Sequence, residues 1–181
     1  MYNKDRILWI TRTAGLVALL IALQVASASV GNPIVTGAVV NFMLIVSVMT
    51  CGLASGLSVA VFSPIAAKFF GIGPFWIFIP FIAAGNIALV WLWHFIGNLN
   101  MGHKYTAYVV ASICAATAKS LVLYIGIVRI AIPVFLSLPE QQAVIISYIF
   151  SIQQFITASL GGISATAMLP ALKRILEERR E

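Results

Sequence analysis

Charged residues are scarce in this sequence. Asp, Glu, Lys and Arg together make up 9% of its 181 residues, whereas they make up about 25% of a typical water-soluble domain. Hydrophobic residues make up 61%, and the mean hydropathy is +1.04. This composition excludes a water-soluble fold. It predicts a single integral membrane domain over residues 1–181 in the lipid bilayer, with no room for a separate soluble domain.

Acidic side chains are the scarcest charged class, with five Asp and Glu against eleven Lys and Arg. They are Asp5, Glu140, Glu177, Glu178 and Glu181, and all lie outside the apolar segments. The apolar segments therefore hold no carboxylate for a proton relay, and this absence argues against a cationic substrate. The net charge of +6 is concentrated near the chain ends, which indicates an anionic membrane surface rather than nucleic acid as its partner.

Cysteine and histidine are also rare, and neither occurs in a metal-binding pattern. Cys51 and Cys114 lie inside apolar segments, and His94 has no second ligand placed to share a metal with it. Ser120 follows Lys119, but adjacent residues on a helix point about 100° apart, so the pair is a poor nucleophile and base. No Walker A motif is present. We therefore expect no metal, no cofactor and no enzymatic activity.

The apolar segments predict an all-α membrane protein, a bundle of six transmembrane helices separated by Gly-, Pro- and Asn-containing turns. The expected helices cover residues 6–28, 37–51, 57–70, 75–96, 105–132 and 143–171. Basic residues gather at both chain ends and in the loop 97–104. The positive-inside rule then places both termini in the cytoplasm.

Lys119 is the most unusual residue in the predicted membrane segments. It lies about fourteen residues into the helix predicted for 105–132, near mid-depth in the bilayer. An ionisable side chain at that depth is costly and usually faces a partner or a water-filled cavity. With no acid available, Lys119 must reach the membrane surface, be neutral, bind carbonyls or amides, or meet an external anion.

Amide side chains at similar depth predict a polar pocket around this lysine. Gln153 and Gln154 are adjacent and point about 100° apart, so we expect one of them to face the pocket. Arg129 and Lys68 lie near the outer helix ends, where they either line the mouth of an anion-binding pocket or extend to the membrane surface. Gln24 is a further amide near mid-depth, and hydrogen bonding between helices is the alternative role for all the amides. The candidate pocket residues are Asn86, Lys119, Gln153, Arg129 and Asn41.

The first predicted helix carries alanine at every fourth position, at Ala14, Ala18, Ala22 and Ala26. Positions four apart share one face of a helix, so these alanines form a smooth strip. In lipid, small residues let another helix approach closely. The strip either packs inside the protein's own bundle or docks a separate membrane subunit.

Together these features resemble the substrate-binding S components of energy-coupling factor (ECF) transporters, the vitamin importers of bacteria. The resemblance extends over essentially the whole chain, and it includes the basic start at Arg12, the alanine helix, the short second helix and the six-helix plan. Three segments contribute to it, namely TGAVVNFML (36–44), SPIAAKFFGIGP (63–74) and PFIAAGN (80–86).

The resemblance implies a binding subunit in the bacterial plasma membrane that captures one micronutrient from outside with high affinity. It then docks on a transmembrane coupling subunit driven by two ATPase subunits, topples in the membrane and releases the solute inward. For this sequence, the resemblance assigns docking to Ala14, Ala18, Ala22 and Ala26. It assigns substrate binding to Asn86, Lys119, Arg129 and Gln153, with Asn32 and Pro33 in the loop that covers the site.

A basic, amide-rich pocket suits an anionic or neutral polar vitamin. Pantothenate is slightly favoured because its carboxylate can pair with Lys119, and folate-, pyridoxine- and cobalamin-related compounds are the alternatives. The main alternative function is that of a small secondary transporter or channel, although the two halves of the chain show no internal repeat. Two further alternatives, which we favour less than a transporter or channel, are an intramembrane enzyme and a purely structural membrane subunit.

Overall fold

The computed structural model describes residues 4–73, 75–136 and 138–178, and within these ranges the secondary structure consists of helices joined by short turns, with no strand. The elements are α1 (Lys4–Ala28), α2 (Pro33–Cys51), α3 (Leu53–Phe69), the 3-10 turn η1 (Trp76–Phe78), α4 (Ile79–Gly97), α5 (Lys104–Leu123), the π-helical η2 (Tyr124–Ala131), α6 (Ile132–Phe135), α7 (Glu140–Ile149) and α8 (Ile152–Glu178). Within the described ranges, five helical stretches are long and apolar enough to cross a membrane, and α3 is a shorter apolar helix. The expectation of an all-α protein with several helices long and apolar enough to span a membrane is confirmed.

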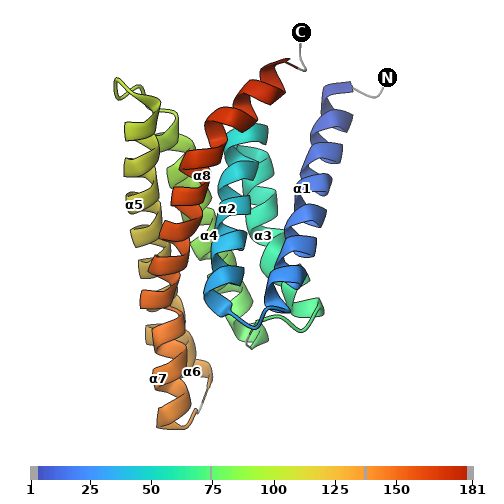
Figure 1. Cartoon of the computed structure of the whole chain (residues 1–181). Helices are drawn as coiled ribbons and strands as arrows, with labels where there is room; N and C mark the ends of the chain where they lie inside the picture. Colours follow the sequence, from blue (N-terminus) through green and yellow to red (C-terminus); the bar gives the residue numbers. More distant parts are fainter. Residues whose placement is uncertain (1–3, 74, 137, 179–181) are drawn as a thin grey trace.

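The helices alternate in direction and form one bundle. Figure 1 shows both chain ends and the α4–α5 loop at one end of the bundle, which we call the termini end, and the α1–α2 and α3–α4 connections at the other, which we call the loop end. α2 lies at the centre and packs against α1, α3, α4 and α8. α1 packs only against α2 and α3 to any extent, so it is a peripheral helix with one side turned away from the bundle.

Several helix boundaries differ from those expected from the sequence: α4 begins at Ile79 rather than at residue 75, α8 continues to Glu178 rather than ending at 171, and the starts of α2 and α3 have clear local causes. α2 begins at Pro33 rather than at residue 37, because the Oδ1 of Asn32 accepts a hydrogen bond from the backbone N–H of Ile34 at 2.9 Å and caps the helix. α3 begins at Leu53 rather than at residue 57, because Gly52 alone makes the turn from α2 with a φ of +85°. Glycine adopts that conformation at little cost.

The last two predicted helices are each interrupted at the loop end. The stretch from Tyr105 passes from α5 into π-helical η2 and then α6, and α7 is separated from α8 by a break at Phe150 and Ser151. The 31-residue segment Tyr105–Phe135 would extend about 46 Å at 1.5 Å per residue, well beyond a hydrocarbon core of about 30 Å. Figure 1 accordingly shows α6 and α7 reaching beyond the other helices at the loop end.

Glycine lets α8 approach its neighbours closely. A Cβ on Gly161 would lie 2.7 Å from the Cβ of Asn41 and 2.8 Å from the backbone nitrogen of Phe42, so α8 lies directly against α2 there. A Cβ on the next residue, Gly162, would collide with Ser112 of α5. Because helices in lipid associate through close packing, these two glycines fix α8 between α2 and α5.

The termini half of the bundle is filled by a large apolar core. Its biggest fully buried side chains include Trp93 and Tyr108, whose rings lie 5.9 Å apart, together with Leu44, Leu89 and Leu169. A second, smaller cluster lies toward the loop end and consists of Phe78, Leu123, Ile127, Ala131 and Phe150. The polar residues of interest lie between these two cores.

We predict that Gly161→Ala lowers the free energy of unfolding by about 1–3 kcal/mol, because the new methyl group meets backbone atoms that cannot move aside. Gly15→Ala on α1 is the matched control, since its Cβ would meet nothing within 4 Å and alanine is the better helix former. Thermal unfolding of both variants in mild detergent measures the difference. Equal stabilities would contradict the close packing of α8 on α2.

Candidate functional site

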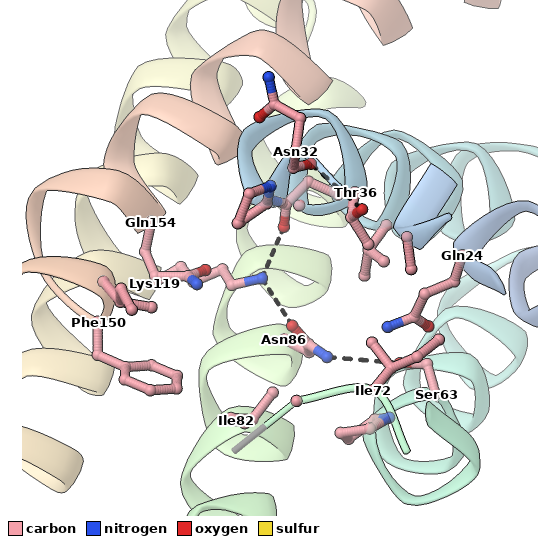
Figure 2. A pocket seen from close by; sticks show the side chains of 18 of the residues that line it. Gln24, Asn32, Thr36, Ser63, Ile72, Ile82, Asn86, Lys119, Phe150 and Gln154 are labelled. Atoms are coloured by element: carbon pink, nitrogen blue, oxygen red, sulfur yellow. Dashed lines mark hydrogen bonds between the residues drawn. The ribbon is translucent and has the colours of Figure 1, made fainter. Parts of the chain in front are cut away.

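Lys119 is buried inside the bundle, with its side chain only 3% exposed. Its ammonium donates one hydrogen bond to the Oδ1 of Asn41 at 2.6 Å and another to the Oδ1 of Asn86 at 2.7 Å. The three side chains come from α5, α2 and α4, so the lysine joins three helices at one point (Figure 2). Of the four roles expected for Lys119, the structure shows the one in which it binds amides.

Second contacts hold each asparagine with its oxygen toward the lysine. The Nδ2 of Asn41 donates to the Oγ1 of Thr157 on α8 at 3.3 Å. The Nδ2 of Asn86 donates to the backbone carbonyl of Ala60 at 3.3 Å and lies 3.5 Å from the Oγ of Ser63, both on α3. Because the amide nitrogens have acceptors, the amide oxygens are left to face the ammonium.

This cluster forms the floor of a cavity of about 500 Å³ that lies toward the loop end. The lining is mainly apolar and includes residues of the α1–α2 and α3–α4 connections as well as helix ends. Its members are Gln24, Ala28, Gly31, Asn32, Pro33, Thr36, Gly37, Val40, Asn41, Ser63, Pro64, Ile72, Gly73, Ile82, Asn86, Lys119, Ile146, Ile149, Phe150 and Gln154. A volume of this size and an apolar lining with a few polar groups are typical of small-molecule sites.

No described carboxylate lies beside the ammonium of Lys119 on the cavity floor. The described acidic side chains Glu140 and Glu178 are both exposed, and Glu178 pairs with Arg174 at 3.1 Å. An ammonium has three hydrogens, and Asn41 and Asn86 take two of them. The protonated Lys119 therefore keeps one donor without a partner among the described residues at the cavity, an arrangement that is costly in a membrane and makes Lys119 a candidate functional residue.

Gln24 of α1 adds a second unsatisfied group to the cavity. Its Oε1 is buried and accepts no hydrogen bond from any described residue. Figure 2 shows Gln24 and Lys119 approaching the cavity from opposite sides, with Asn86 between them. The site thus offers a donor with positive charge on one side and a free acceptor on the other.

Phe150 is held at the edge of the same cavity by the break between α7 and α8. Its ring lies 5.5 Å from that of Phe78 in an edge-to-face arrangement, within the apolar cluster at the loop end. The π-helical segment contributes Ile127 and Ala131 to that cluster. The irregular ends of the last helices therefore shape the apolar wall of the cavity.

The structure brings four of the six predicted binding residues to the cavity and leaves two outside it. Asn86, Lys119, Asn41 and Asn32 line the cavity, although the Oδ1 of Asn32 caps α2. Gln153 is buried away from the lining, and its neighbour Gln154 faces the cavity instead. Arg129 lies in η2, where it is exposed and outside the cavity.

Some polar residues in or beside the site, among them Gln24, Ser63 and Thr157, are not among the predicted binding residues, although Gln24 was noted as an amide near mid-depth. Gln24 shares an α1 face with the inward-facing Thr13, Leu20 and Ser27, and this helical spacing was a usable signal. Ser63 and Thr157 are hydroxyls of a kind common in membrane helices, and nothing in their spacing pointed to Asn86 or Asn41.

The alanine strip of α1 lies on the outside of the bundle. Ala14, Ala18, Ala22 and Ala26 are all exposed, whereas Thr13 faces inward and its Oγ1 lies 2.7 Å from the Oγ of Ser55 on α3. The alanine strip therefore does not pack inside the bundle, which was one of the two roles considered for it.

We predict that Asn86→Leu destabilises the protein and that a Lys119→Met background removes most of this effect. The leucine deprives a buried ammonium of an acceptor, and a hydrogen bond to a charged group contributes about 1.5–3 kcal/mol. A double-mutant cycle from thermal or denaturant unfolding gives the coupling energy. Asn98→Leu is the control, because Asn98 is exposed and bonds only to its own helix at the carbonyl of His94. Additive effects of the Asn86 and Lys119 changes would contradict the coupling.

Comparison with models of known protein families, with curated proteins and with solved structures gives no match. Any functional argument therefore depends on the cavity, its buried charge and the outer surface of this chain.

Proposed function

We propose that this chain is the substrate-binding membrane subunit of an ECF-type importer for a small water-soluble vitamin. The observation that carries the proposal is Lys119, a buried cation on the floor of a cavity with no carboxylate partner among the described residues. A protein keeps such a costly group where it binds something, and an anionic ligand would supply the missing negative charge.

The arrangement of the two halves supports a binding site rather than an open channel. The cavity lies toward the loop end, whereas the termini half is filled by Trp93, Tyr108 and the large apolar core around them. A solute that reaches Lys119 from the loop end therefore meets packed side chains beyond it. With the termini in the cytoplasm, as the distribution of basic residues favours, the cavity faces the outside of the cell.

The chemistry of the cavity selects a compact ligand with one anionic end. Lys119 suits a carboxylate, the free Oε1 of Gln24 suits a hydroxyl or amide donor, and the apolar walls suit aliphatic carbon. Pantothenate combines a carboxylate, hydroxyl groups, an amide and a methylated chain, so it is the first ligand to test. Folate- and pyridoxine-related compounds follow, and a complete cobalamin is too large for about 500 Å³.

Transport by such a subunit needs partners. The chain has no Walker A motif, so ATP hydrolysis would come from two separate ATPase subunits acting through a transmembrane coupling subunit. The exposed alanine strip on the peripheral helix α1 is available for that contact, because close approach in lipid depends on small residues. The proposed function implies a location in the bacterial plasma membrane.

We predict that pantothenate raises the thermal stability of the purified protein within a panel of water-soluble vitamins, and that Lys119→Met weakens its binding. Loss of a charge-assisted hydrogen bond corresponds to a roughly 10- to 100-fold higher Kd, measured by isothermal titration calorimetry. Arg129→Gln is the control, because this exposed cation lies outside the cavity and its removal leaves the Kd unchanged. A panel without any stabilising vitamin would favour a channel or a structural subunit over the binding subunit. Equal binding by Lys119→Met would remove the lysine from the site.

We predict that Ala18→Leu or Ala22→Leu abolishes vitamin uptake by cells while the purified variant still binds the vitamin. The larger side chain blocks close approach of a partner helix without reaching the cavity, because both alanines are exposed. Ala167→Leu makes the same change on an exposed position of α8 and leaves uptake intact. Uptake at the wild-type rate in the α1 variants would show that the strip is not the docking surface.

A further inference from the structure

A second and larger hollow lies on the outside of the bundle, near the termini end. It is a groove of about 880 Å³ over α2, between α1 and α8, which both pack on α2. Figure 1 shows these two helices on either side of α2, with the C-terminal part of α8 leaning toward the side of α1. The groove shares no residue with the cavity at Lys119.

The walls of the groove are apolar and its mouth is basic. Arg12 of α1 and Lys173 of α8 are the charged members, and Thr50 and Cys51 lie at the end of α2. The remaining lining residues are Gly15, Leu16, Leu19, Leu23, Phe42, Met43, Val46, Met49, Met168, Leu172 and Ile175. One end therefore carries positive charge while the rest presents hydrocarbon.

No described carboxylate neutralises these two cations. The one ion pair among the described side chains joins Arg174 to Glu178, and Arg12 forms no hydrogen bond with any of them. Lys173 holds its ammonium 5.7 Å from the centroid of the Tyr108 ring on α5, which does not line the groove, so the ammonium must turn away from that ring to meet a ligand at the mouth. The mouth of the groove thus attracts an anion.

The length of the groove matches one leaflet of a bilayer. From Arg12 to Leu23, α1 rises about 16 Å at 1.5 Å per residue, and half of a hydrocarbon core is about 15 Å thick. Charged side chains of a membrane protein lie at the level of the lipid headgroups, so Arg12 marks the surface and Leu23 the mid-plane. An acyl chain that enters at the basic mouth and follows the groove toward the mid-plane would contact apolar side chains along its whole length.

We propose that this groove is a binding site for one anionic phospholipid of the termini-side leaflet. Arg12 and Lys173 bind its phosphate, and an acyl chain lies along α2 between Leu19 of α1 and Met168 of α8. Basic pockets between transmembrane helices bind anionic headgroups in this way. The site is separate from the vitamin-binding cavity and does not depend on the proposed transport function.

The experiment uses the full chain in mild detergent with an equal mixture of phosphatidylglycerol and phosphatidylcholine of identical acyl chains. Native mass spectrometry measures the ratio of the two lipids retained. We expect phosphatidylglycerol to dominate, and Arg12→Gln with Lys173→Gln to reduce the ratio roughly 25-fold, about fivefold for each charge. The control is Arg129→Gln with Arg174→Gln, which changes the net charge equally outside the groove and leaves the ratio unchanged.

Gly15→Leu provides an independent test of the apolar part of the site. A Cβ at Gly15 meets nothing within 4 Å, so a leucine side chain can extend into the groove without disturbing α1. Retention of both lipids should fall while the thermal stability of the lipid-free protein does not.

Three outcomes of the lipid-mixture experiment would overturn the proposal. They are equal retention of the two lipids by the wild type, an unchanged ratio in the Arg12 and Lys173 variant, and an equal loss in the control variant.

Discussion

The rest of the site depends on one constraint, which is a positive charge buried in the middle of a membrane bundle without a carboxylate beside it. Burying an ammonium in a medium of low polarity is costly, and two amide oxygens offset only part of that cost. The lysine is therefore informative about function, because its cost in stability is not recovered by any contact within the described residues, and a bound anion would recover it.

The helix packing is arranged to hold the amides around that charge. Asn41 can point its oxygen at Lys119 because its nitrogen bonds Thr157, and Thr157 is close enough because Gly161, one turn further along α8, lets the two helix backbones meet. On the other side, α3 supplies the carbonyl of Ala60 and the hydroxyl of Ser63 to Asn86. Four helices besides α5 thus take part in positioning one ammonium group.

The sequence was sufficient to predict the fold class and the centre of the site. Composition and apolar segment length indicated a helical membrane protein, and depth along the helices placed Lys119 and Asn86 at one level. It could not predict which of Gln153 and Gln154 faces the cavity, because that choice depends on the rotation of α8, which begins anew after the break at Phe150 and Ser151. Arg129 was misplaced for a similar reason, since π-helical winding changes the direction of side chains relative to an α-helix.

The unequal filling of the two halves of the bundle has a consequence for how such a protein would move a solute. Beyond Lys119, the path toward the termini is occupied by a core that includes Trp93, Tyr108 and Leu44, and opening it would expose closely packed side chains. Movement of the whole bundle relative to the membrane would leave that core intact, but it needs a partner to hold the protein in its second position. α1 is suited to that contact, because it packs on the bundle along one side and turns its alanine strip away from it. Under the proposed function, a rigid binding subunit whose termini half stays closed and whose α1 docks a partner therefore fits this packing better than a gated pore built from the same helices.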